Sequence, residues 1–180
     1  MKYIRLACVV AGLLALIFSS CQDAGVGLPR DGEWVIYRLS DATLLSDQVR
    51  NVPLSQLSVA AAPFISVRDI GWYRWDTHRF ECLPHVRGRI DSLARYGGSV
   101  RGVPFVVTVG KEPIYLGSFW WSYSSIMPWC PTIEITFIGG SGSTDLQLGI
   151  ELPPLHQGED SRQDWRIHEA LRRAGVLVGS

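Results

Sequence analysis

The chain of 180 residues is 47% hydrophobic and 19% charged, which is a globular composition, and its length predicts one domain. The chain has 17 basic residues (lysine plus arginine) and 17 acidic residues (aspartate plus glutamate). It therefore has no excess of positive charge with which to bind a polyanion. This balance excludes nucleic-acid binding as the main role.

The N-terminal residues carry the most specific signal in the sequence. Lys2 and Arg5 precede the uncharged stretch 6–18, which is shorter than the ~20 residues of a membrane span and typical of a signal peptide. Two serines and then Cys21 follow. The pattern resembles the signal peptide of bacterial lipoproteins, although Phe18 stands where that family usually has leucine. An ordinary secretory signal or an uncleaved anchor is the alternative interpretation.

The lipoprotein resemblance implies that residues 1–20 are removed and that Cys21 is acylated, for example with palmitate, and anchors the chain to a membrane. Gln22 after the cysteine, in place of aspartate, favours the outer membrane with the protein facing the periplasm. Residues 21–33 are predicted to be a lipidated, flexible, polar tether, and residues 34–180 a single folded domain.

The first half of this domain mixes strand and helix signals. Residues 34–39 are rich in β-branched and aromatic side chains and predict a strand, and residues 54–65 suggest another. Ser66 and Asp69 have the spacing of a capping box, which predicts a short helix over 70–75. The alternation in 78–83 then predicts a strand.

The second half begins at Pro84, which predicts a helix running to Tyr96. An apolar strand over 103–109 and a hairpin partner over 113–121 come next. Further elements are predicted as follows: a strand over 132–138, a turn over 139–144, a strand over 146–152, and a helix that opens with a capping box at 161–164 and ends at Gly175.

These elements predict one α+β domain with a mainly antiparallel sheet of five to seven strands and two main helices on one face. The order of strand, turn-helix, strand, helix and hairpin over roughly residues 60–120 also loosely resembles the periplasmic head of SecD-type translocase subunits. This resemblance implies a fold and supplies no function.

Two cysteines remain beyond the acylation site, Cys82 and Cys130. In an oxidising compartment they are candidates for a disulfide, and two buried free thiols are the alternative. His78, Cys82 and His85 are spaced like zinc ligands, with Cys130 as a possible fourth donor, but surface or capping histidines explain the pattern better. No metal and no cofactor is therefore expected.

Aromatic side chains are the most distinctive feature of the predicted domain. Trp120 and Trp121 are adjacent in a predicted strand and must face opposite sides. Core packing explains most of these residues, and a surface that binds a partner or ligand is the functional hypothesis. The candidates for this surface are Trp120, Trp121, Tyr123 and Trp129.

Three carboxylates, Asp69, Asp76 and Glu81, lie near another aromatic group in the sequence. A glycosidase needs two such groups across a cleft, whereas a helix start, a turn and an exposed strand face explain them individually. The sequence therefore predicts an envelope lipoprotein with a binding or assembly role, whose partner is an envelope protein or a glycan. The alternative is an envelope hydrolase that cleaves glycan with these carboxylates.

Overall fold

A single mixed sheet dominates the computed structural model, which describes residues 31–93, 100–135, 146–154 and 158–179. Its strands among these residues lie in the order β2-β1-β5-β6-β7-β8-β4-β3-β9. Their bounds are β1 Trp34–Arg38, β2 Ile65–Ser66, β3 Ile70–Arg74, β4 Arg79–Cys82, β5 Val103–Val109, β6 Glu112–Trp120, β7 Thr132–Glu134, β8 Leu146–Glu151 and β9 Leu177–Val178.

The strand pairings confirm the α+β class and correct its details. Neighbouring strands are antiparallel except in two pairs, β6 with β7 and β3 with β9, which are parallel. The nine strands among the described residues exceed the five to seven predicted. Strands β2, β7 and β9 have only two or three residues each. Strands this short do not show the alternation of apolar and polar residues by which a strand is predicted from sequence.

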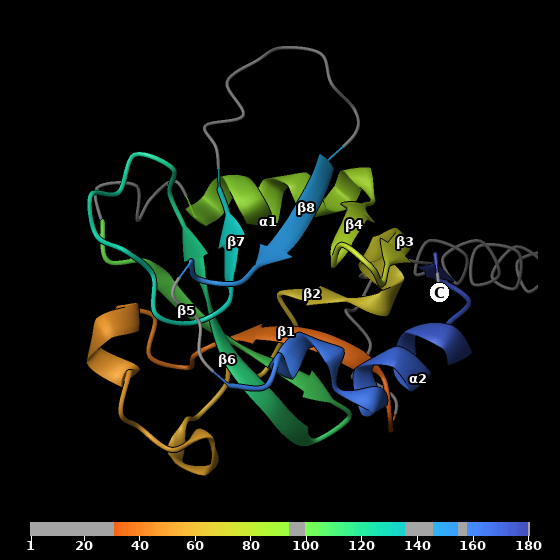
Figure 1. Cartoon of the computed structure of the whole chain (residues 1–180), viewed down its shortest axis with the longest axis horizontal. Helices are drawn as coiled ribbons and strands as arrows, with labels where there is room; N and C mark the ends of the chain where they lie inside the picture. The colour runs from red at the N-terminus through yellow and green to blue at the C-terminus, as the bar shows by residue number, and fades with distance from the viewer. Residues whose placement is uncertain (1–30, 94–99, 136–145, 155–157, 180) are drawn as a thin grey trace, which may run out of the picture.

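The sheet curls so that strands far apart in its order meet in one core (Figure 1). The ring of Trp34 on β1 lies 5.8 Å from Tyr73 on β3 and 5.8 Å from Phe80 on β4, in edge-to-face contacts. Four strands separate β1 from β4 in the sheet order. These aromatic contacts therefore close the sheet around the core.

A separate apolar layer covers the other face of β1 and β5. Val106 points away from the main core and packs with Leu39 and Val49. The 3-10 turns η1 (Ser46–Val49) and η2 (Leu54–Gln56) form this cover. The strand predicted over 54–65 is therefore wrong except at its end, where β2 begins at Ile65.

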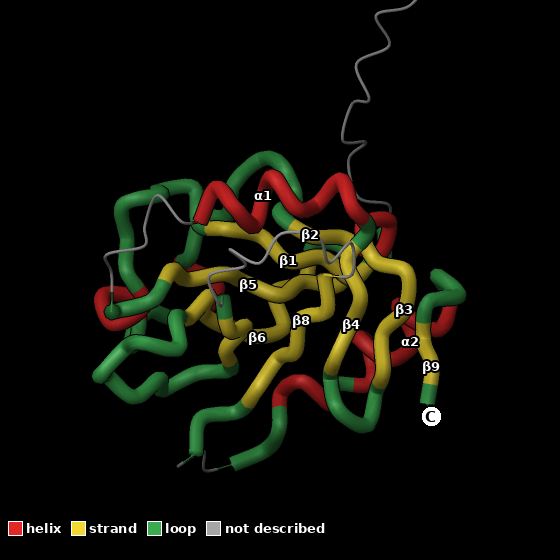
Figure 2. Tube along the Cα trace, turned by 90° about the horizontal axis from the view of Figure 1, so that it is seen from above, coloured by secondary structure: helices red, strands yellow, loops and turns green. Residues whose placement is uncertain are grey.

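Two α-helices are present in the described residues, α1 (Arg87–Ser92) and α2 (Trp165–Arg173). The 3-10 turn η4 (Pro84–Val86) opens α1, as the proline predicted. Both helices place apolar side chains in the main core, and they lie well apart (Figure 2). Asp164 caps α2 and accepts a hydrogen bond from the Arg166 N–H, while Gly175 follows the helix with φ +73°.

The helix predicted over 70–75 is wrong, because residues 70–74 form β3. Ser66 and Asp69 do form the predicted capping box, but it closes the 3-10 turn η3 (Val67–Asp69). A β-bulge between Ile70 and Trp72 lets both Ile70 and Tyr73 face the core. Their spacing of three residues imitates a helical face.

Candidate groove on the outer face of β7 and β8

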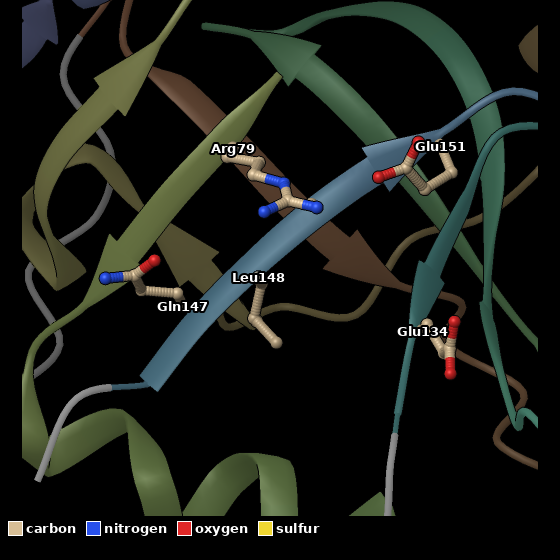
Figure 3. Close-up of a pocket in the computed structure, with 6 residues that line it drawn as sticks. Arg79, Glu134, Gln147, Leu148 and Glu151 are labelled. Carbon is tan, nitrogen blue, oxygen red and sulfur yellow. The ribbon is translucent and has the colours of Figure 1, made fainter. Parts of the chain in front are cut away.

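Two adjoining cavities lie on the outer face of β4, β8 and β7, beside the segment 121–131. One has a volume of about 390 Å³ and the other about 270 Å³, and both are lined by Glu134 and Glu151. Because they share these two carboxylates, we describe them together as the groove. Figure 3 shows its smaller part, which is lined by Arg79, Glu134, Gln147, Leu148, Gly149 and Glu151.

The larger part of the groove is mostly apolar. Trp120, the last residue of β6, lines it and packs against Gly102, which has φ +70° and no room for a Cβ atom. Trp121 is adjacent and turns its side chain into the main core. The two tryptophans thus face opposite sides, as strand geometry requires.

The segment 121–131 forms the wall of the groove. Two hydrogen bonds from Ser124 hold this segment in place. The Ser124 hydroxyl donates to the carbonyl of Val100 at 2.6 Å, and the Ser124 N–H donates to the carbonyl of Trp121 at 2.9 Å. Three large apolar side chains on this segment face solvent, with exposed fractions of 45% for Tyr123, 46% for Ile126 and 57% for Met127. Such a concentration of exposed apolar surface is typical of an interaction site.

The smaller part of the groove is charged. Arg79 on β4 lies directly opposite Gly149 on β8. A Cβ atom on Gly149 would lie 3.0 Å from Oε1 of Glu151 and 3.8 Å from Nε of Arg79. Within the described part of the chain, no ion pair is formed by Arg79, Glu134 or Glu151. These charges are therefore available to a ligand.

The predicted partner surface is only partly exposed in the structure. Trp120 lines the groove, whereas Tyr123 is exposed on the segment 121–131 and lines neither cavity. Trp121 packs in the main core and is only 2% exposed, and it is also among the residues that line the larger cavity. Trp129 is half-buried beneath the Arg50 guanidinium, which lies 5.8 Å from the centre of its ring.

None of the three predicted catalytic carboxylates lines either part of the groove. Asp76 lies in the exposed β3–β4 turn and Glu81 on the outer face of β4. Asp69 precedes β3 at the opposite end from Asp76, and it accepts hydrogen bonds from Arg89 at 2.5 Å and His85 at 2.8 Å. Burial opposes ionisation of Asp69, but these bonds and those from Ser66 outweigh it and lower the pKa.

The Cys82–Cys130 disulfide is not formed, and both thiols are free and buried. Cys82 faces Leu146 at the start of β8, whereas Cys130 precedes Thr132, which faces Glu151 at the end of β8. The length of β8, about 16 Å, far exceeds the ~7 Å between Cα atoms that a disulfide allows. Burial raises the pKa of each thiol to about 12.

A buried polar cluster lies on the core side of the sheet. The hydroxyl of Tyr73 lies 3.1 Å from Nδ1 of His78, and Nε2 of His78 lies 3.9 Å from Oδ2 of Asp160, which pairs with Arg162 at 2.7 Å. Burial and the nearby Arg162 lower the pKa of His78 to about 4. His78 is therefore neutral near pH 7 and donates or accepts one hydrogen bond per ring nitrogen.

The metal hypothesis for His78, Cys82, His85 and Cys130 finds no support in the described residues, where no three metal-ligating side chains gather. Within the same residues, no helix has the length and apolar character needed to cross a membrane. Cys21 and the signal sequence lie outside the described residues. Comparison with known proteins found no matching family model, no curated relative and no similar solved structure.

Sequence reasoning missed Arg79, Glu134 and Glu151 as site residues. Each lies on the solvent side of a strand in which polar and apolar residues alternate. This pattern predicts a surface position, but it does not indicate that the residue belongs to a binding site. The three come together only because β8 lies between β7 and β4.

Proposed function

We propose that this protein is a membrane-anchored envelope lipoprotein with a non-catalytic role, and that its groove binds a polypeptide segment of a partner. The anchor rests on the resemblance of the first 21 residues to lipoprotein signals. The binding role rests on one observation, the junction of an exposed apolar wall with carboxylates that have no ion pair in the described residues.

The chemistry of the groove defines the kind of segment that fits it. Ile126 and Met127 offer apolar surface, and a flexible methionine adapts to partners of different shape. Glu134 and Glu151 at the junction of the two cavities attract a basic side chain. A segment that carries a lysine or arginine next to apolar residues satisfies both parts.

The anchor is tested by labelling cells with a fatty-acid analogue. We expect label on the wild-type protein and none on Cys21→Ser. Label on neither protein would contradict the lipoprotein assignment and leave the groove to be tested alone.

The binding role is tested by photo-crosslinking in cells. A photoreactive amino acid at Ser125, which lines the groove, should capture a protein partner, whereas the same group at Lys111, at the other end of β6, should not. The Glu134→Gln, Glu151→Gln double variant should reduce capture at Ser125 several-fold, with Glu81→Gln as the matched control outside the cavities. Equal capture at Ser125 and Lys111, or no effect of the double variant on capture, would refute the proposal that the groove binds a partner.

The alternative function is a glycan hydrolase that uses Asp69, Asp76 and Glu81, none of which lines the groove. It predicts that a single substitution at each residue abolishes an activity and leaves the fold intact.

A further inference from the structure

Helix α2 lies beside the point where the described chain begins. The Gly110 N–H in the β5–β6 turn donates to the carbonyl of Glu33 at 2.8 Å. A Cβ atom on Gly32 would lie 3.2 Å from Nη2 of Arg173, at the end of α2. Arg166 at the start of α2 pairs with Glu112 of β6 at 3.0 Å. The helix and the turn therefore flank the N-terminal side of the domain (Figure 1).

Trp165 is the most exposed large hydrophobic side chain among the described residues, with an exposed fraction of 73%. It lies on the same face of α2 as Arg172, seven residues later. The opposite face carries Ile167, Ala170 and Leu171, which are buried in the core. Trp165 therefore lies outside the core, and an indole ring in such a position suits the headgroup region of a bilayer.

Basic side chains lie at the other end of the same helix and in the β5–β6 turn beside it. Arg172 and Arg173 are exposed and share one carboxylate, that of Glu169, so one positive charge is left over. Lys111 in the β5–β6 turn forms no ion pair with any described residue and adds another. Arg166, next to Trp165, is in turn shared by two carboxylates, those of Glu112 and Asp164, so these groups together keep an excess of one positive charge. The surface thus combines an exposed indole with a weak positive charge, which suits the headgroup region of a bilayer that contains anionic lipid.

We propose that the outward face of α2, with Trp165, Arg172, Arg173 and Lys111, rests on the headgroups of the bilayer that holds the acylated Cys21. This inference depends on the proposed lipid anchor. The ten peptide units between Cys21 and Asp31 extend at most about 35 Å, which keeps this surface within reach of the membrane.

The orientation has a direct consequence for the groove. Strand β6 begins at Glu112, beside α2, and ends at Trp120, which lines the groove. Eight residue steps along a strand span about 27 Å. With α2 on the bilayer, the groove therefore opens on the side of the domain that faces away from the membrane.

The test uses the full acylated protein reconstituted into vesicles of phosphatidylethanolamine and phosphatidylglycerol. A spin label is attached to Ala174→Cys, an exposed position at the end of α2, and in a separate protein to Ser125→Cys on the groove. The natural thiols Cys82 and Cys130 are buried and do not compete for the label. The measured quantity is the collision rate of each label with a water-soluble nickel complex.

We expect reconstitution to lower the collision rate several-fold at position 174 and to leave it unchanged at position 125. Adding Trp165→Ser, which removes an exposed side chain and leaves the core intact, should return position 174 to its value in solution. An acylated protein whose label at 174 stays as accessible as the label at 125 would overturn this inference alone. A protein that carries no acyl chain would overturn the anchor itself.

Discussion

Nδ1 of His78 lies 3.1 Å from the hydroxyl of Tyr73, and His78 is the buried residue immediately before β4. His78 also has φ +50°, the one positive value among the described non-glycine residues. Burial and the nearby Arg162 guanidinium make this imidazole costly to protonate, and the Asp160 carboxylate 3.9 Å from Nε2 offsets that cost only in part. This relationship makes stability depend on pH.

The unfolded chain binds the proton of His78 near pH 6.5, whereas the folded protein binds it only near pH 4. The stability that His78 contributes is therefore complete above pH 6.5 and is lost as the pH falls toward 4. The loss amounts to about 3 kcal/mol. Urea unfolding at several pH values should show it, and His78→Asn, which tolerates positive φ, should lose much less over the same range. Identical pH slopes in the two proteins would contradict this prediction.

Asp69 should matter for stability rather than for catalysis. Its carboxylate accepts hydrogen bonds from the Ser66 N–H at 2.7 Å, from His85 and from Arg89. Asp69→Asn removes the charge that balances Arg89 and should lower the free energy of unfolding by about 3 kcal/mol. The matched control Asp76→Asn, in an exposed turn, should stay within about 0.5 kcal/mol of the wild type. Denaturant titration measures both, and equal values would argue against the structural role.

Two glycines of the sheet should differ in how much stability they lose when replaced by alanine. A Cβ atom on Gly117 would press on the Phe105 ring in the core and lie 2.9 Å from the carbonyl of Pro131. Gly117→Ala should therefore cost about 3 kcal/mol of unfolding free energy. On Gly149 the same atom meets mainly the flexible side chains of Arg79 and Glu151, so Gly149→Ala should change stability little. Thermal unfolding distinguishes these outcomes.

Gly149→Leu extends this comparison to the groove. The larger side chain would lie between Arg79 and Glu151 and should reduce crosslinking from Ser125 while the protein stays folded. Undiminished capture by a folded Gly149→Leu protein would place the bound segment elsewhere.

The two thiols should behave as buried free cysteines. Since their pKa values are raised to about 12, alkylation at pH 8 should be slow in the native protein and rapid in denaturant. Mass spectrometry should find two alkylated cysteines after denaturation without reductant. Recovery of a bridged peptide instead would contradict the arrangement of the two residues at opposite ends of β8.

The long regular strands could be predicted from the sequence, because residues 103–109 and 113–120 carry a continuous apolar or alternating pattern. The pattern failed at 70–75, where a single bulge residue shifted the side-chain period. The groove could not be predicted, since Arg79 and Glu151 belong to strands paired across about seventy residues of sequence, and no local pattern encodes that pairing. The position of Asp160 and Arg162 beside His78 could not be predicted either, because these residues are also far from His78 in the sequence.

The pairing of β1 with β5 also determines how the domain bears force. Trp34 lies opposite Val109 and Arg38 opposite Phe105, so the chain enters β1 at the end of the hairpin far from Trp120. A pull between the N-terminal side and a partner held in the groove then acts along the strands. The interstrand hydrogen bonds are loaded in shear, side by side, and must rupture together instead of unzipping one after another. We expect this geometry to resist such a pull better than one in which the strand pairs separate one at a time.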